Sequence, residues 1–250
     1  YSHQIPIDSS KLESWSNIIF GNLNKPFEFK EYSKFELKIE LKYVIGQKYV
    51  IKRKRKIIIG NDLPEINFVY RKGFPSLFNS EVNFDYFEIG AKGIKTIGRW
   101  GESRWMLRAG SFINKSSLRI IEYKFFRGSD DIFFSDPVTS MQLLGTIMYT
   151  NNAFLQANYI HHFTNILNKV PIIRFFKLSF AVGAGTLNIP SQNFYDFELF
   201  GGIEKTFRIK RQFFRFGFYA VTADSNLSNA KFKLKFGISF FDNYKNKWGY

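Results

Sequence analysis

Residues 231–241 read Lys-Phe-Lys-Leu-Lys-Phe-Gly-Ile-Ser-Phe-Phe, and this stretch decides the fold. Every second side chain from Phe232 to Phe240 is large and apolar, and the positions between them hold lysine, glycine or serine. Successive side chains of a β-strand point to opposite faces, so the stretch predicts a ribbon with one apolar and one polar face. A soluble β-sandwich gives such a ribbon the surroundings it needs, and so does a membrane β-barrel with a hydrated lumen.

The same alternation recurs along most of the chain. Residues 34–43, 195–209 and 214–220 alternate apolar side chains with charged, polar or small ones. No stretch has the periodicity of an amphipathic helix of convincing length. At roughly nine to eleven residues per span, the chain accommodates about ten to twelve strands. We therefore expect an all-β fold, an antiparallel transmembrane β-barrel or the C-terminal portion of one. It would form one domain over residues 1–250, with residues 1–26 as a candidate lead-in outside the barrel.

The composition agrees with strands that cross a membrane. The 250 residues include 31 Phe, 13 Tyr and 4 Trp, yet the mean hydropathy is only −0.20, because charges interleave with the aromatic residues. No run approaches the roughly 18 consecutive apolar residues of a membrane helix. Cysteine is absent, which excludes disulfides, thiolate metal sites and cysteine nucleophiles. The net charge of +15 points to nucleic acid, an anionic membrane surface or anionic solutes in a charged lumen.

In a barrel the two faces of these strands have different surroundings. The apolar face would meet lipid, and it comprises Phe197, Leu199, Phe214, Phe216, Phe218, Phe232, Leu234, Phe236, Ile238 and Phe240. The polar face would line the lumen, and it comprises Glu198, Glu204, Arg215, Lys231, Lys233 and Lys235. We expect these lysines to lie near Arg215 and the two acids in a charge-balanced lumen. A selective anion path is the alternative.

The basic run Lys52-Arg53-Lys54-Arg55-Lys56 breaks the alternation. Arg53 and Arg55 would share a face with Tyr49 and Ile51, and an arginine that faces lipid at the midplane costs about 2–4 kcal/mol. Either the segment extends beyond the hydrocarbon layer or its register shifts. It could bind nucleic acid or the phosphates of lipopolysaccharide. We favour a solvated hairpin extension.

The connections between strands suggest an orientation. Residues 210–212 form a very short turn, whereas residues 185–194 and 223–229 are predicted as longer polar loops. Outer-membrane barrels have tight periplasmic turns and long outer loops. The pattern therefore predicts that the last strand runs towards the periplasm.

His161 and His162 are the first candidates for chemistry. Adjacent residues of a strand point to opposite faces, so the two cannot share one metal ion. A lone histidine could act as a base beside a serine, as in some outer-membrane lipases. The sequence has no Gly-x-Ser-x-Gly elbow and no recognisable acid partner. We therefore expect no enzyme activity.

Other polar or glycine clusters have structural explanations. Asp130, Asp131 and Asp136 could bind calcium or act as acid and base, but acids in such a turn-rich stretch usually cap turns. Gly201 and Gly202 precede no helix, so we expect them to permit bends and close packing in a strand. No metal and no cofactor is expected.

Four sequence pieces follow one another in the second half of the chain: Phe125-Phe126-Arg127-Gly128-Ser129, Ser135-Asp136, Tyr159-Ile160-His161-His162-Phe163 and residues 167–178. In these pieces the chain resembles the C-terminal barrel of an uncharacterised outer-membrane family common in Bacteroidota. Members carry an N-terminal carboxypeptidase-regulatory-like domain, which is not evident here. The family is distantly similar to BamA-like assembly and secretion barrels, and Phe126-Arg127-Gly128 resembles their lumen-inserted Arg-Gly loop motif.

The resemblance implies residence in the outer membrane of a Gram-negative bacterium. We expect a non-enzymatic scaffold or accessory component of outer-membrane protein assembly or surface export. Its partners would be outer-membrane lipid, lipopolysaccharide and other outer-membrane proteins. A passive pore is one alternative. A soluble all-β nucleic-acid-binding protein is another, and it is disfavoured because a stacking platform needs aromatic and basic side chains on the same face.

Overall fold

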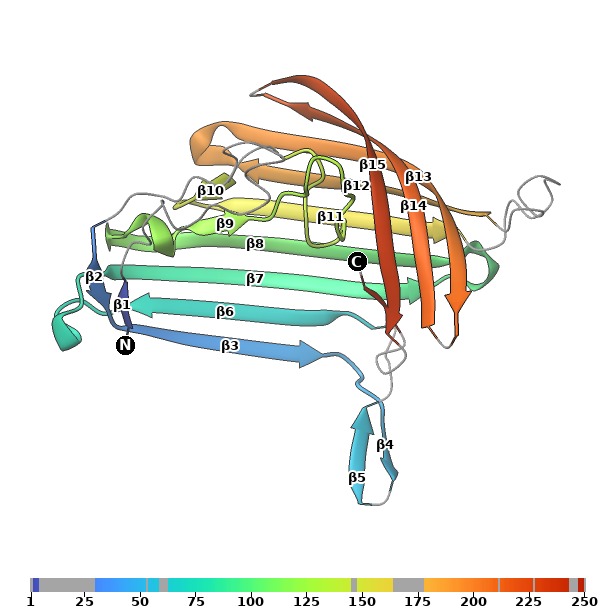
Figure 1. The fold of residues 1–250 in the computed structure, drawn as a ribbon. Helices are drawn as coiled ribbons and strands as arrows, with labels where there is room; N and C mark the ends of the chain where they lie inside the picture. The colour runs from blue at the N-terminus through green and yellow to red at the C-terminus, as the bar shows by residue number, and fades with distance from the viewer. Residues whose placement is uncertain are drawn as a thin grey trace.

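The computed structural model describes residues 2–4, 30–52, 54–58, 63–144, 148–163, 178–210, 212–226, 228–242 and 247–249. These residues are arranged around one ten-stranded sheet with the order β16-β15-β14-β13-β12-β11-β8-β7-β6-β3 (Figure 1). Every pair of neighbours in it is antiparallel. The expectation of an all-β antiparallel fold is therefore confirmed.

The strands of this sheet are β3 (Glu36–Val44), β6 (Glu65–Gly73), β7 (Asn83–Thr96), β8 (Glu102–Ser117), β11 (Phe154–Phe163), β12 (Leu178–Ile189), β13 (Phe194–Ile209), β14 (Gln212–Ser225), β15 (Ser228–Asp242) and β16 (Lys247–Gly249). Three small antiparallel pairs lie outside it: β1 (Ser2–Gln4) with β2 (Tyr32–Lys34), β4 (Tyr49–Lys52) with β5 (Arg55–Ile58), and β9 (Lys124–Phe126) with β10 (Met148–Thr150).

The sheet is open in the described part of the chain, where β3 and β16 form its two ends and do not pair with each other. Closure into a barrel thus remains a prediction. Most of the candidate lead-in over residues 1–26 lies outside the described residues, except for β1, which pairs with β2.

Two of the predicted loops are largely strand. β12 continues to Ile189 and β13 begins at Phe194, so only residues 190–193 connect them. Similarly, only residues 226–227 connect β14 to β15. The prediction of long loops here was wrong, because hydrogen bonds to the neighbouring strand keep even polar stretches extended. With short connections at both ends of β14, the lengths of these loops do not indicate an orientation.

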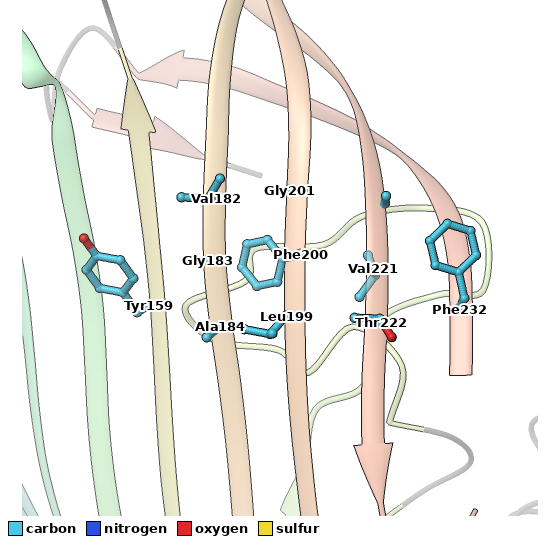
Figure 2. Close-up of a pocket in the computed structure, with 11 residues that line it drawn as sticks. Tyr159, Val182, Gly183, Ala184, Leu199, Phe200, Gly201, Val221, Thr222 and Phe232 are labelled. Atoms are coloured by element: carbon cyan, nitrogen blue, oxygen red, sulfur yellow. The ribbon is translucent and has the colours of Figure 1, made fainter. Parts of the chain in front are cut away.

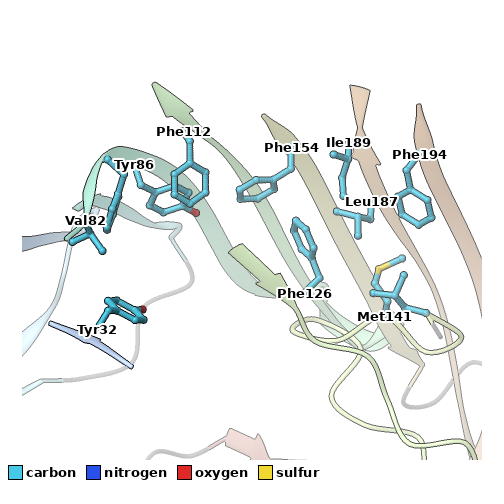
Figure 3. Packing of buried hydrophobic residues seen from close by; sticks show 12 residues of the cluster. Tyr32, Val82, Tyr86, Phe112, Phe126, Met141, Phe154, Leu187, Ile189 and Phe194 are labelled. Atoms are coloured by element: carbon cyan, nitrogen blue, oxygen red, sulfur yellow. The ribbon is translucent and has the colours of Figure 1, made fainter. Parts of the chain in front are cut away.

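The chain between β8 and β11 returns over one face of the sheet (Figure 1). We call residues 118–144 the inner segment, the sheet face that it packs against the covered face, and the opposite one the open face. Figure 3 shows Phe126 and Met141 of the inner segment beside Phe112, Phe154 and Leu187 of the sheet, all in one buried cluster. Much of the hydrophobic core therefore lies between the sheet and the inner segment.

The β4–β5 hairpin projects beyond the end of β3 (Figure 1). Its tip contains the basic run, in which Lys54 has a positive φ of 60°, while Arg53 lies outside the described residues. The side chains of Tyr49, Val50 and Ile51 are exposed. The basic run is thus part of a hairpin extension, as favoured above.

Candidate functional site: the two faces of the sheet

The open face of the sheet is apolar. All ten side chains predicted to face lipid are exposed except Phe214, which is half-buried; the exposed fractions run from 39% for Ile238 to 66% for Phe232. Rings pair across neighbouring strands, as in Phe218 and Phe236, whose centroids are 5.1 Å apart. Soluble monomers rarely expose contiguous apolar patches larger than a few hundred Å². This face therefore needs a covering.

The polar side chains predicted on the same strands lie on the covered face. Glu198 and Glu204 are each 1% exposed and Lys235 is fully buried, while Arg215 and Lys233 are half-buried. The side chain of Lys231 is outside the described part of the chain. The alternation in the sequence thus places ionic and apolar groups on opposite faces, as strand geometry requires.

The partners of Glu198 and Lys235 belong to the inner segment. The Glu198 carboxylate accepts the backbone N–H groups of Gln142 and Leu143, and the Lys235 ammonium donates to the carbonyls of Gln142 and Asp130. Both charges are therefore used to hold backbone groups of the inner segment. Of the lysines whose side chains the structure describes here, neither Lys233 nor Lys235 forms an ion pair with Glu198 or Glu204.

Glu204 is the centre of a second buried group. Its Oε2 lies 2.9 Å from Nδ1 of His162 and 3.7 Å from Nη1 of Arg215, and its Oε1 accepts a hydrogen bond of 2.5 Å from the hydroxyl of Tyr219. The guanidinium of Arg215 also lies 4.0 Å from the ring centroid of Trp248. Arg215 and Glu204, two of the residues predicted for the polar face, thus lie together, and this group connects β11, β13, β14 and β16.

The ring of Tyr219 lies on three glycines, Gly202, Gly217 and Gly237, from neighbouring strands β13, β14 and β15. A Cβ at Gly237 would lie 2.6 Å from Cε2 of that ring, so the close approach requires glycine. The ring of Phe134 from the inner segment stacks on the other side of Tyr219. The glycines of these strands therefore permit close packing, as predicted for Gly202.

The inner segment also bonds to the edge of β15. The N–H of Phe236 donates to the carbonyl of Ile132 over 2.9 Å, and the N–H of Phe134 donates to the carbonyl of Phe236 over 2.7 Å. Phe133 and Phe236 thereby form a parallel bridge. Lys233 and Asp131 form an ion pair of 2.5 Å beside it.

Ion pairs also hold the N-terminal part of the sheet to the inner segment. Arg71 bonds the carboxylates of Glu36 and Glu122 at 2.5 and 2.7 Å, and Lys124 bonds Glu88 at 2.5 Å. Burial lowers the pKa of Lys124, which lies outside the ten-stranded sheet. Because Glu122 is 1% exposed, its carboxylate depends on the cations of Arg71 and Lys34 for its solvation.

Two of the three aspartates of the inner segment, Asp130 and Asp136, stabilise turns as expected, whereas Asp131 pairs with Lys233. Asp130 accepts the N–H groups of Ile132 and Phe133, and Asp136 accepts that of Val138. In the part of the chain that the structure describes, no group of three or more histidine, aspartate or glutamate side chains could hold a metal ion.

His161 and His162 lie on opposite faces, as predicted, and His161 has a partner that the sequence did not indicate. Its Nδ1 lies 2.7 Å from Oγ of Ser103 on β8, and its Nε2 lies 3.0 Å from the carbonyl oxygen of Trp100. The hydroxyl of Tyr159 is 3.1 Å from the same Oγ. The pairing of β8 with β11 brings Ser103 opposite His161, 58 positions away in sequence. No local sequence motif indicates this contact between Ser103 and His161.

A groove crosses the open face beside this group (Figure 2). Its lining is almost entirely apolar and includes Tyr159, Val182, Leu199, Gly201, Ala220 and Phe232. Its middle, on β12, β13 and β14, combines small residues such as Gly201 and Ala220 with Val182 and Leu199. The aromatic side chains of Tyr159 and Phe232 lie at its two ends in Figure 2. The hydroxyl of Tyr159 therefore links the groove to Ser103 and His161.

None of the helices among the described residues is long and apolar enough to cross a membrane. No curated protein and no solved structure matches the chain. Residues 7–203 match the profile of the C-terminal domain of a family of unknown function, DUF5686. The match covers more than half of the 250 residues. The chain therefore belongs to the DUF5686 family and carries its C-terminal domain.

Proposed function

We propose that this chain is an integral outer-membrane β-barrel protein that acts as a scaffold or accessory component of outer-membrane protein assembly or surface export. The observation that carries the proposal is the separation of side chains across one sheet. Large apolar residues such as Phe218 and Phe236 are exposed on the open face, while Glu204 and Lys235 are buried on the covered face. Lipid would cover the first group, and the second would face the interior.

A lipid covering would remove the free-energy cost of exposing the open face to water. At about 25 cal/mol per Å² of apolar surface, an uncovered aromatic face several strands wide would be strongly unfavourable in water. Backbone groups at an open sheet edge are equally unfavourable in hydrocarbon, so the proposal includes closure of the sheet between its two ends, β3 and β16. Closure would make the covered face the lumen.

The inner segment supports a scaffold more than a passive pore. It carries Phe126-Arg127-Gly128, the piece that resembles the lumen loop of BamA-like barrels, and it packs Phe134 and Met141 against the covered face. A segment bound by Glu198 and Lys235 would obstruct a channel. The proposed role needs no reaction and no cofactor. Its partners are outer-membrane lipid, lipopolysaccharide and other outer-membrane proteins, and nucleic acid is not among them.

Membrane extraction tests the proposed residence. The protein should stay in the membrane fraction through a high-salt wash, require detergent for release, and migrate differently on gels before and after boiling. Release by salt alone would contradict the proposal and favour a soluble basic protein. The proteins that copurify in mild detergent test the assembly role; recovery without any outer-membrane protein would contradict it.

A pair of arginine substitutions sharpens this test. Leu199→Arg places a charge in the middle of β13 on the open face, where lipid contact would cost about 2–4 kcal/mol. Val50→Arg places the same charge on the projecting hairpin. The first variant should lose the heat-modifiable form and the second should keep it. Equal behaviour would argue against lipid at Leu199.

A further inference from the structure

We propose that Ser103 and His161 form a nucleophile–base pair that cleaves an acyl ester of a membrane lipid, with the acyl chain lying in the groove on the open face. This activity goes beyond the scaffold role, and its choice of substrate rests on the proposed membrane residence. The adjacent histidines His161 and His162 did not indicate this activity in the sequence, because the serine comes from another strand.

The direction of each hydrogen bond follows from the Trp100 carbonyl. A carbonyl oxygen only accepts, so His161 must donate to it from Nε2–H. In the neutral imidazole Nδ1 is then unprotonated and accepts the hydroxyl proton of Ser103 over 2.7 Å. An activated nucleophile has this arrangement: a hydroxyl bonded to a base, and a third group that fixes the orientation of the base.

The burial of the pair protects this geometry. Ser103 and His161 are 6% and 7% exposed, although they lie on the face that is otherwise open. The ring of Phe163 lies 4.4 Å from that of His161, in an edge-on contact. Because the base has little contact with solvent, its bond to Ser103 competes with few water molecules.

Tyr159 connects the pair to the groove. Its ring is 42% exposed and lines the groove, and its hydroxyl is 3.1 Å from Ser103 Oγ. With the Ser103 proton held by His161, the Tyr159 hydroxyl donates to Ser103 Oγ. When the ring turns, an ester carbonyl can take its place, and the same hydroxyl can donate to the oxyanion.

The groove fits an acyl chain better than a polar ligand. It extends from β11 to β15, about 19 Å at ~4.8 Å per strand. Small residues such as Gly201 and Ala220 deepen a face that elsewhere carries large side chains. A chain lying there has apolar contacts along most of its length, and the hydroxyl groups in the lining belong to Tyr159 at one end and to Thr222 on β14.

The reaction balances with water as the second reactant. Ser103 Oγ attacks the ester carbon while its proton passes to His161 Nδ1. The tetrahedral intermediate expels the lipid alcohol, which takes that proton, and leaves an acyl-serine. Water, activated by the same nitrogen, then attacks the acyl-serine. Fatty acid is released and the Ser103 hydroxyl is restored.

A fluorophosphonate probe tests the pair directly in detergent micelles. Serine activated by a base forms an Oγ–P bond with the probe and releases fluoride. We expect the folded wild-type protein to be labelled, and Ser103→Ala and His161→Gln to lose labelling by about a hundredfold or more. Ser111→Ala, on the same strand with its hydroxyl bonded only to the Phe112 carbonyl among the described contacts, should label like the wild type.

The β-sheet circular dichroism of each variant in micelles shows that it is folded before its labelling is compared. No labelling of the folded wild type, or equal labelling of Ser103→Ala, would overturn the proposal. Release of fatty acid from phospholipid in mixed micelles then tests the substrate, and cleavage of short soluble esters alone would overturn the lipid assignment. Since labelling in micelles does not depend on membrane residence, its result stands apart from the extraction test of the scaffold role.

Discussion

The rings of Phe134 and Tyr219 stack with centroids 3.7 Å apart and planes within 7° of parallel. Phe134 belongs to the inner segment and Tyr219 to β14, so this contact joins the two layers of the molecule. Tyr219 rests on glycines of three strands and donates to Glu204, which fixes its ring before Phe134 packs on it. The stack is therefore a principal attachment of the inner segment.

Phe134→Ala should detach this part of the inner segment. Phe134 is 3% exposed, and the loss of a buried phenylalanine side chain typically costs about 3–5 kcal/mol. The free energy of unfolding in detergent measures the effect. Phe133→Ala is the matched control, because the neighbouring ring is 50% exposed. Equal losses of unfolding free energy for the two variants would show that the stack of Phe134 on Tyr219 does not contribute specifically to stability.

Gly202→Ala should displace the ring of Tyr219. The added Cβ would overlap the ring and lie 2.8 Å from the carbonyl oxygen of Phe218, so we expect a loss of about 1–3 kcal/mol. At Gly201, the nearest atom would be Cγ1 of Val182 at 3.8 Å, an ordinary contact. Gly201→Ala should therefore leave the unfolding midpoint nearly unchanged. A larger loss at Gly201 than at Gly202 would contradict the described packing.

Glu204→Gln should leave Arg215 without its carboxylate partner inside the sheet. Breaking a buried ion pair by removing one partner costs about 3–5 kcal/mol. The matched control is Glu40→Gln on β3, which removes an exposed ion pair with Lys38 of 2.9 Å and should leave the free energy of unfolding nearly unchanged. Chemical unfolding of both variants gives the comparison. A cost for Glu204→Gln no greater than that of the control would mean that water reaches the pair.

The basic hairpin should bind anionic lipid headgroups at the membrane surface. Each lysine or arginine near an anionic surface contributes about 1 kcal/mol. Because the chain has no cysteine, Ile51→Cys provides a single position for an environment-sensitive fluorophore. In nanodiscs, anionic phospholipid should shift its emission to the blue relative to neutral phospholipid, and high salt should reverse the shift.

Removing the hairpin charges tests the cause of that shift. Replacement of Lys52, Lys54, Arg55 and Lys56 by glutamine should abolish it. Replacement of Arg208 and Lys210, exposed residues at the same end of the sheet, should not. A shift that persists without the hairpin charges would mean that Tyr49 and its apolar neighbours, and not the cations, contact the membrane.

The period-2 pattern predicted the sheet and the two faces correctly because it reports on single strands. Phe218 is exposed and Tyr219 is buried, as their parity requires. The pattern also predicted that Tyr219 would differ from its neighbours, but not that glycines of adjacent strands would make room for its ring. That information depends on register, which brings Gly202 opposite Tyr219.

The inner segment and the Ser103–His161 pair could not be predicted for the same reason. Phe134 lies in a stretch rich in aspartate and serine, whose turns the local sequence does predict, but its stacking partner is far along the chain. Ser103 lies on β8 and His161 on β11, and these two strands are neighbours because β9 and β10, which come between them in sequence, pair outside the main sheet. The local β-propensity of a segment does not indicate whether it joins the main sheet or pairs outside it.

The bridge between Phe133 and Phe236 has a consequence for the behaviour of the protein in concentrated solution. Unpaired strand edges are templates for edge-to-edge aggregation between molecules. Here the inner segment of the same chain already bonds the backbone of Phe236. Because the segment is tethered, its effective concentration is in the millimolar range, and a second molecule would need a similar concentration to compete. The protein thus protects its own edge without a proline or an inward-pointing charge at that position.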